Sequence, residues 1–350
     1  MLRRMGETVD PKGAVVKIKD ASFPAPFASE LEYNSPVHGN WNIVHTGMQV
    51  PESIQIYVCA DNCMRGVVLT AAEMNTAERF SFVILEEQDL LNSNLEDITI
   101  EGVTDVLNKR GDHPKAVLLF TVCLHHFVGS NLDYIYSELE YRFPDICFIR
   151  CYMDPIMQKH GLTPDQKLRK AMYDPLPACK PNMKTVSVFG SDFVLDESSD
   201  IKRLLKRYEY TVRELPACKT WQDLLDMSKG SLFIDCYLAG KYGMEAQAER
   251  LGREHLYLPG SFDYDEIEKQ LKQLTDALGL PELTEDELAH ERENCEEVLA
   301  RAKELIKDMP VTLDYLYHPR PLGLAKLLLT HGFCVKAVYL DGISPEEKEE

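Results

Sequence analysis

Three of the ten cysteines follow predicted strands, at points where one sheet would present them together. Cys59 and Cys63 (CADNC) come after the apolar run IQIYV, and Cys123 ends the apolar run AVLLFTV. Because ligands of open parallel sheets bind outside the carboxyl ends of the strands, we expect these thiols at one edge. A position before a helix favours the thiolate, the form that binds metal. The pattern predicts a metal-cluster site, and the alternative is that the three are small core residues.

Polar side chains near these thiols are further candidates. His125 and His126 follow Cys123 after one intervening leucine and are candidate catalytic groups that would donate protons or hydrogen bonds. His38 and His45 lie in SPVHGNWNIVHTG, a loop that we expect over the same edge. Asp61, inside CADNC, is either an oxygen ligand or the N-cap of the following helix, and we expect the N-cap.

The other seven cysteines are expected outside the site. Cys147 and Cys151 lie in one predicted strand, so their Cα atoms are roughly 13 Å apart, too far to share a tetrahedral metal. The remaining five are predicted in apolar strands (Cys236, Cys334) or in loops and helices without a motif (Cys179, Cys218, Cys295).

The net charge and the hydropathy limit which classes of partner and which cell compartment we expect. The formal net charge is −19 and the pI is about 5.0, which argues against a nucleic acid or an anionic membrane as the partner. The mean hydropathy is −0.25, and no apolar run approaches the ~18 residues of a membrane span. The N-terminus MLRRMGETVDPKG lacks the apolar stretch of a secretory signal. We therefore expect a cytoplasmic protein with reduced cysteines.

The elements that position these residues are predicted to alternate regularly between strands and helices. Short apolar runs alternate with helical stretches over 54–153 and again over 185–278. This pattern predicts an α/β fold of tandem doubly wound, Rossmann-like parallel-sheet domains. The last strand–helix–strand unit cannot bury both faces of its strands, so either the chain is truncated or a partner completes this domain; we expect truncation. The predicted parts are an N-terminal arm (1–30), domain I with the cluster cysteines (31–183), domain II (184–282), a connecting helix (283–308) and an incomplete domain III (309–350).

Several nucleotide and hydrolase motifs are absent from the sequence. It contains no G-x-x-x-x-G-K-[ST], so the chain itself should not hydrolyse ATP through a phosphate loop. No G-x-G-x-x-G follows a predicted strand, and no G-x-S-x-G is present. Nicotinamide binding and serine hydrolysis of that type are therefore disfavoured.

From about residue 30 to 350 the chain resembles the nitrogenase component 1 family of oxidoreductases. AVLLFTVCLHHFVGSNLD is similar to the family's strand–Cys–loop–Gly–acidic helix element, and IQIYVCADNCMRGVV resembles another cysteine-bearing element. The resemblance implies that Cys123 and either Cys63 or Cys59 hold an iron–sulfur cluster of the [4Fe-4S] type. The family's earliest cysteine is missing from VHGNWNIVH, so Cys59 or His38 would take its place.

A second departure concerns the iron–molybdenum cofactor. Family members that hold it use a cysteine on the helix after the strand matched by SLFIDCY, where this chain has Met244 in KYGMEAQAERLG. A thioether binds iron far more weakly than a thiolate, so no iron–molybdenum cofactor is expected. The cleft between domains I and II is instead expected to bind substrate or nothing, lined near Ser191, Asp192 and Tyr237.

Three functions remain open at this point. The first, implied by the resemblance, is the electron-accepting subunit of a nitrogenase-like oxidoreductase. Its cluster would be shared with a second copy or a paralogous subunit, and a separate ATP-dependent reductase resembling the nitrogenase iron protein would supply electrons. The second is a non-catalytic scaffold or chaperone for iron–sulfur or metallocofactor assembly. The third is a Rossmann-type ligand-binding module with structural cysteines.

Overall fold

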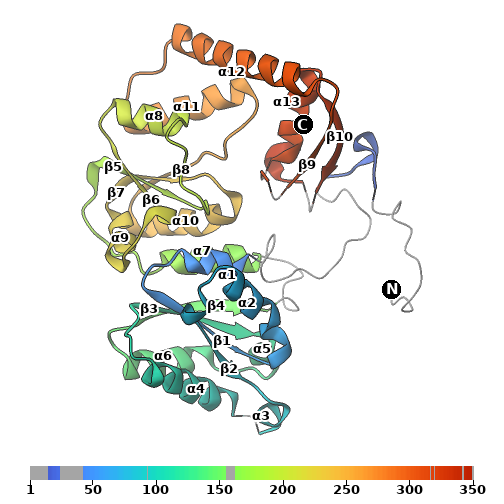
Figure 1. Ribbon diagram of the computed structural model, residues 1–350. Helices are drawn as coiled ribbons and strands as arrows, with labels where there is room; N and C mark the ends of the chain where they lie inside the picture. The colour runs from blue at the N-terminus through green and yellow to red at the C-terminus, as the bar shows by residue number, and fades with distance from the viewer. Residues whose placement is uncertain are drawn as a thin grey trace. The chain divides into compact units, whose positions relative to one another are not determined.

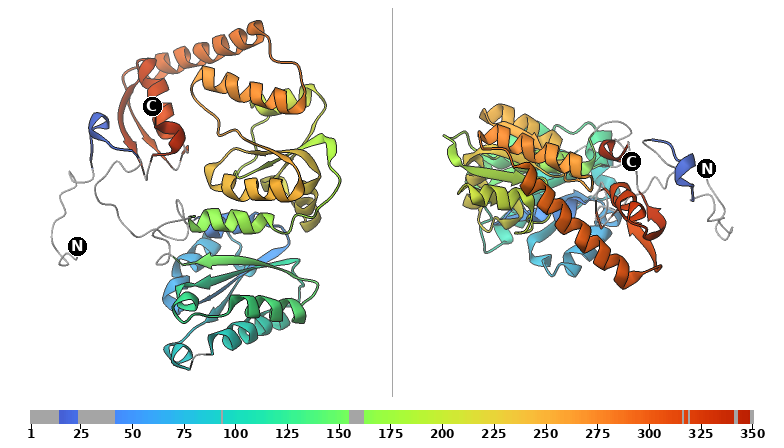
Figure 2. Two further views of the ribbon diagram at one scale, coloured as in Figure 1. Left: turned by 180° about the vertical axis from the view of Figure 1, so that it is seen from behind. Right: turned by 90° about the horizontal axis from the view of Figure 1, so that it is seen from above.

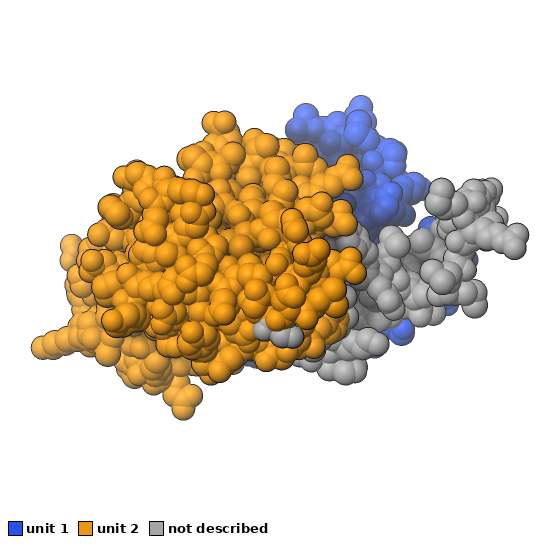
Figure 3. Space-filling model, turned by 90° about the horizontal axis from the view of Figure 1, so that it is seen from below, with its two compact units in different colours: residues 1–33, 261–269, 283–350 blue, residues 34–260, 270–282 orange. Residues whose placement is uncertain are grey.

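The computed structural model describes residues 15–23, 42–92, 94–154, 162–315, 317–318, 320–340 and 343–348. The chain divides into two compact units, which Figure 3 distinguishes by colour. The large unit comprises residues 34–260 and 270–282, and the small unit comprises residues 1–33, 261–269 and 283–350.

The first sheet of the large unit is parallel and has the strand order β2-β1-β3-β4 (Figure 1). Its strands are β1 (Ser53–Cys59), β2 (Phe80–Ile84), β3 (Ala116–Val122) and β4 (Cys147–Met153). Every residue of β1 and β3 is buried, as expected for central strands that are covered on both faces. The rings of Tyr57 and Phe120 stack across these two strands with centroids 4.3 Å apart.

Helices cover both faces of this sheet. On one face, α4 (Leu95–Lys109) and α6 (Leu132–Arg142) pack into a core with alternate residues of the strands. On the other face lie α1 (Ile43–Met48), α2 (Asp61–Glu73) and α7 (Pro164–Tyr173). Two short helices, α3 (Glu87–Leu91) and α5 (Cys123–Phe127), follow β2 and β3.

The second sheet is also parallel, with the order β6-β5-β7-β8. Its strands are β5 (Asn182–Phe189), β6 (Thr211–Glu214), β7 (Gly230–Asp235) and β8 (Glu254–Tyr257). The associated helices are α8 (Asp200–Arg207), α9 (Trp221–Asp226), α10 (Leu238–Leu251) and α11 (Tyr264–Leu278). Figure 2 shows from behind that α10 lies on the side of this sheet facing α7.

Helix α7 joins the two sheets into one body. It packs against β4 and α1 of the first sheet and against α10 of the second. A single buried cluster contains Leu168 and Met172 of α7, Tyr57 of β1 and Phe233 of β7. Helices α7 and α10 approach each other closely at Gly243 of α10, where an added Cβ would lie 2.6 Å from the Cα of Lys170 in α7. The large unit is therefore built around a core that both sheets share.

The small unit contains a two-stranded parallel sheet. Its described elements are two 3₁₀ turns (Ile18–Asp20 and Pro345–Glu347), α12 (Glu285–Ile306), β9 (Pro310–Asp314), α13 (Pro321–Thr330) and β10 (Cys334–Tyr339), together with the part of α11 up to Lys269. Across the described ranges of both units, no helix is both long and apolar enough to cross a bilayer.

The α/β fold with parallel doubly wound sheets is confirmed. Helix α7 begins with Thr163 as N-cap and Pro164 in its first turn. One local expectation is wrong. Cys236, expected inside a strand, lies one residue beyond the end of β7 and is partly exposed.

Candidate functional site

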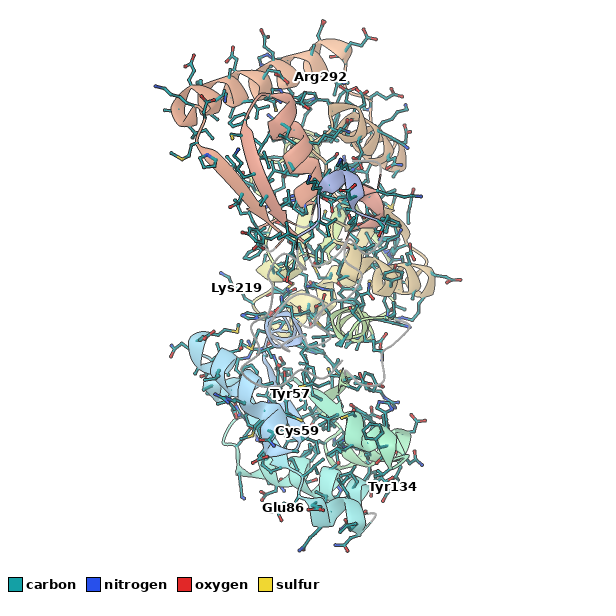
Figure 4. The ribbon with its side chains drawn as sticks, turned by 90° about the vertical axis from the view of Figure 1, so that its right-hand side faces the viewer. Tyr57, Cys59, Glu86, Tyr134, Lys219 and Arg292 are labelled. Carbon is teal, nitrogen blue, oxygen red and sulfur yellow. The ribbon has the colours of Figure 1, made fainter. Side chains whose placement is uncertain are left out.

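The candidate cysteines lie where the chain order of the first sheet reverses. In the order β2-β1-β3-β4, the connections from β1 and β3 leave toward opposite sides, which opens a crevice at their carboxyl ends. Cys59 is the last residue of β1, Cys63 lies in the first turn of α2, and Cys123 begins α5. Figure 4 labels Cys59 beside Tyr57 of the same strand.

The three thiols differ in burial. Cys59 is fully buried and belongs to the core. Cys63 is exposed and Cys123 is half-buried. The exposed and half-buried thiols are thus accessible to a ligand, whereas Cys59 has the environment of a core residue.

The surroundings of the three thiols raise their pKa values and so disfavour their ionisation. Burial, with smaller contributions from the negative charges of Cys63 and Asp61, raises the pKa of Cys59 to about 12. Burial also raises the pKa of Cys63, with a second contribution from Cys123. For Cys123, burial raises the pKa more than the N–H groups of Leu124 and of Cys123 itself lower it. In the unliganded chain desolvation therefore outweighs the effect of the helix N-terminus and favours the neutral thiols.

The metal-binding side chains at this crevice are too few for a complete cluster site, and they fit better a cluster that is shared with a second subunit. Within the described ranges, no group of three or more His, Cys, Asp or Glu side chains converges to hold a metal ion. Cys63 and Cys123 follow the neighbouring strands β1 and β3, and as accessible thiols each could contribute one soft ligand. An iron–sulfur cluster ordinarily takes four thiolates, so further ligands have to come from outside this set.

The two histidines after Cys123 have different environments. His125 is buried, and its Nε2 lies 3.2 Å from Thr99 Oγ1 while its Nδ1 accepts a hydrogen bond from the Val122 N–H. Burial lowers the pKa of His125 to about 4, so its ring is neutral. His126 is partly exposed, and its Nε2 lies 3.0 Å from Asp154 Oδ2. Of the two, His126 has the accessible ring.

Asp154 is a site residue that the sequence analysis missed. It follows β4 directly, its side chain is 1% exposed, and Lys167 Nζ of α7 lies 3.9 Å from its Oδ2. The Asp154 charge also raises the pKa of Cys123. The signal available in the sequence is an acidic residue immediately after the strand that pairs with β3.

The remaining candidates near the thiols are placed as follows. Asp61 is the first residue of α2 rather than its N-cap, which is Ala60, so the N-cap expectation is wrong by one residue. His45 lies in α1. His38 lies outside the described residues.

The equivalent crevice of the second sheet contains a buried carboxyl group. Asp235 ends β7, is fully buried, and accepts a hydrogen bond from the Tyr237 N–H at its Oδ1, while its Oδ2 has no partner within the described ranges. Gly190 (φ +82°) and Gly240 pack against this carboxyl group, and a Cβ on either would overlap it. Burial raises the pKa of Asp235 to about 7, opposed by the Tyr237 N–H and by Arg169.

Arg169 of α7 connects this crevice to the first sheet. The buried guanidinium donates to Asp165 (3.1 Å), to the Gly190 carbonyl (2.9 Å) and to Asp192 (2.7 Å). Asp192 also accepts hydrogen bonds from Gln49 at 2.6 Å. Asp192, predicted to line a substrate cleft, is thus occupied by side chains of the large unit itself.

Three other predicted positions have the following contacts. The ring of Tyr237 faces the guanidinium of Arg169 at 5.3 Å. Ser191 Oγ accepts a hydrogen bond from the Phe193 N–H. Met244 is fully buried in α10 and contributes to the shared core.

Comparison with known proteins agrees with this architecture. A family model described as nitrogenase component 1 type oxidoreductase matches residues 100–350. Two solved structures, described as nitrogenase Cp1 at pH 6.5 and at pH 5, are similar in fold with a TM-score of 0.59 and 14% sequence identity in both cases. They cover 84% and 87% of this chain, which spans 60% and 65% of theirs. No curated protein matches the chain.

Proposed function

Because the chain belongs to the nitrogenase component 1 type oxidoreductases, we propose that it is an electron-accepting subunit of a nitrogenase-like oxidoreductase. In this proposal it acts in the cytoplasm and holds an iron–sulfur cluster, of the [4Fe-4S] type, at the crevice between β1 and β3. The observation that carries the proposal is that two accessible thiols, Cys63 and Cys123, follow the neighbouring strands β1 and β3 at that crevice.

The surface around Cys63 supports a partner subunit at this edge. Beyond the exposed thiol, α2 turns Val68 (40% exposed) and Leu69 (55%) to solvent. Phe127 (59%) and Val128 (44%), at the end of α5, are also exposed. A second copy or a paralogous subunit would cover these apolar side chains and supply the missing cluster ligands.

Each residue of the crevice has a distinct role in the proposed site. Cys63 and Cys123 would hold the cluster, which supplies one-electron chemistry when bound. The His126 Nε2 lies 3.0 Å from Asp154 Oδ2, a contact that would fix the orientation of the ring. Lys167 Nζ, 3.9 Å from the same oxygen, partly neutralises the buried Asp154 carboxylate.

The electron donor would be a separate protein, and no iron–molybdenum cofactor is expected in this chain. The sequence has no phosphate loop, so a separate ATP-dependent reductase resembling the nitrogenase iron protein would deliver the electrons. We propose that no iron–molybdenum cofactor is anchored at Met244, since its side chain is enclosed in the core and is a weak neutral ligand. Any substrate near the second crevice would have to use groups other than Asp192, which Arg169 and Gln49 already engage.

Anaerobic iron and sulfide analysis of three purified variants tests the cluster assignment. Cys63→Ala and Cys123→Ala should each lose the brown colour and most of the iron, because each removes a thiol ligand. Cys147→Ala is the matched control, since its thiol lies in β4 and should leave the iron content unchanged. Full iron retention in Cys63→Ala would contradict the assignment.

Activity separates this function from the scaffold alternative. The loaded protein, supplied with a purified reductase and ATP, should oxidise the reductase in the presence of a reducible substrate. Transfer of the intact cluster to an apoprotein acceptor without substrate reduction would instead indicate an assembly scaffold.

A further inference from the structure

Helix α12 of the small unit depends on polar side chains for its docking. It follows the large-unit segment 270–282 in the chain, leads to β9, and contains no buried residue. A helix without a buried apolar stripe gains little free energy from the burial of apolar surface. The polar contacts of its side chains therefore decide how firmly α12 is held against its neighbours in the small unit (Figure 1).

One of these contacts joins α12 to the end of α13. The imidazole of His331, the C-cap residue of α13, lies between two acceptors. Its Nδ1 is 2.8 Å from the Leu327 carbonyl oxygen, and its Nε2 is 3.0 Å from Oε2 and 3.2 Å from Oε1 of Glu296 in α12. Glu296 also accepts a hydrogen bond from the Tyr264 hydroxyl at 2.8 Å.

Both ring nitrogens of His331 thus face oxygens that only accept hydrogen bonds when Glu296 is ionised. The imidazolium donates from both nitrogens, so it satisfies the carbonyl and the carboxylate together. Each neutral tautomer has a single N–H and would turn a lone pair toward an oxygen of either Leu327 or Glu296. The contact therefore fits only the protonated ring.

The groups around the ring favour this charge state. The Leu327 carbonyl and the Glu296 carboxylate raise the pKa of His331, opposed by its partial burial. Hydrogen bonds from Tyr264 and His331 lower the pKa of Glu296, which keeps this carboxyl group ionised at neutral pH. Burial and Glu296 raise the pKa of Tyr264 to about 12, with a smaller contribution from Cys295, so the Tyr264 hydroxyl keeps its proton.

Two cations of α12 flank this contact and are engaged by other groups. Arg292 lies 2.8 Å from Asp265 and 2.6 Å from Glu268, both at the start of α11. The Lys303 Nζ lies 5.7 Å from the ring centroid of Phe333. Among the groups at this contact, the imidazole is the one whose ordinary pKa lies close to physiological pH.

We infer that His331 and Glu296 form a pH-dependent latch, in which the protonated imidazole holds α12 against the end of α13 and deprotonation releases it. The latch is complete below pH ~6.5, the ordinary value for histidine, and is lost as the pH rises through the higher value of the folded chain. Both residues belong to the small unit, and the latch involves none of the cluster cysteines.

An NMR titration of the histidine rings in the full-length protein tests the pairing. Glu296→Gln should weaken proton binding by His331 about threefold, because it removes the charged acceptor of a partly exposed pair. The matched control is Glu293→Gln, an equal charge change at an exposed position of α12, which should leave the His331 titration unchanged. A His331 titration that is the same in Glu296→Gln and in wild type would overturn the proposal.

Hydrogen exchange then measures the release of the helix. In wild type the protection of the α12 amides, corrected for the intrinsic exchange rate at each pH, should fall about threefold between pH 6 and pH 8. His331→Gln, which cannot gain the charge, should show the lower protection at both pH values. His290→Gln, at an exposed position of the same helix, should behave as wild type. Protection that is independent of pH in wild type, or that keeps its pH dependence in His331→Gln, would contradict the latch.

Discussion

At the scale of single residues, the two crevices of the large unit have different chemistry. The first crevice carries thiols that can bind soft metals, and the second encloses Asp235 between two glycines. A carboxyl group with one unpartnered oxygen in a buried site is most stable when it is protonated. This makes Asp235 a pH-dependent element of the fold.

Asp235→Asn should flatten the pH dependence of stability. In the folded chain the pKa of Asp235 is about 7, well above its value of ~3.9 in an unfolded chain. The folded state therefore holds an extra proton between these values, and stability is lost as pH rises from about 4 to 7. The Asn variant, which mimics the protonated acid, should gain up to about 4 kcal/mol relative to wild type between pH 4.5 and pH 8.

Urea unfolding followed by tryptophan fluorescence measures this difference, since Trp221 begins α9 in the large unit. The matched control is Asp145→Asn, at an exposed position, which should leave the pH profile unchanged. An Asp235→Asn profile parallel to that of wild type would show that Asp235 is ionised in the folded chain.

The candidate site residues were predicted from where the strands end in the sequence. The apolar runs place Cys59, Cys63 and Cys123 correctly at the carboxyl edge, because strand direction follows from the alternation of strands and helices. Their differing exposure was not predictable, since it depends on how α2 and α5 pack. Asp154 and Lys167 are 13 residues apart in the chain, and only the packing of α7 beside β4 brings them together.

At the scale of elements, α7 is the helix on which the large unit depends. Its start carries a capping box, Thr163 with Gln166, and Pro164 in its first turn, so it was predictable from local signals. Its role was not, because the hydrogen bonds of Arg169 to Asp192 and Thr46 join residues 23 and 123 positions apart.

Gly243→Ala tests the close packing of α7 on α10. Alanine ordinarily stabilises a helix interior by about 1 kcal/mol relative to glycine. Here its Cβ would lie 2.6 Å from the Cα of Lys170, so the helices would have to separate. We expect a net loss of about 1–3 kcal/mol in the free energy of unfolding, measured in urea.

The control for this substitution is Gly111→Ala, since nothing lies within 4 Å of a Cβ added at that position. Its unfolding midpoint should stay within experimental error of wild type. A stabilised Gly243→Ala protein would mean that α7 and α10 pack less tightly than described.

At the scale of the whole molecule, the incomplete ligand set leads to an expectation about assembly. Two accessible thiols cannot complete a four-thiolate cluster, and the apolar side chains beside Cys63 are exposed. We expect the cluster-loaded, full-length protein to sediment as a dimer, or as a larger assembly with a paralogous subunit. Analytical ultracentrifugation under anaerobic conditions checks this, and a cluster-loaded monomer would refute the shared site.

The shared core also determines how the large unit folds. The sequence has two separate stretches in which strands and helices alternate, which suggests two domains that fold independently. One buried cluster nevertheless runs from β1 through α7 and α10 to β7, and Arg169 hydrogen-bonds to groups on both sides of α7. A fragment ending near residue 183 would keep α7 but expose its apolar face to water, since α10 would be absent. The two sheets should therefore lose their structure in a single cooperative transition, and neither half is an autonomous folding unit.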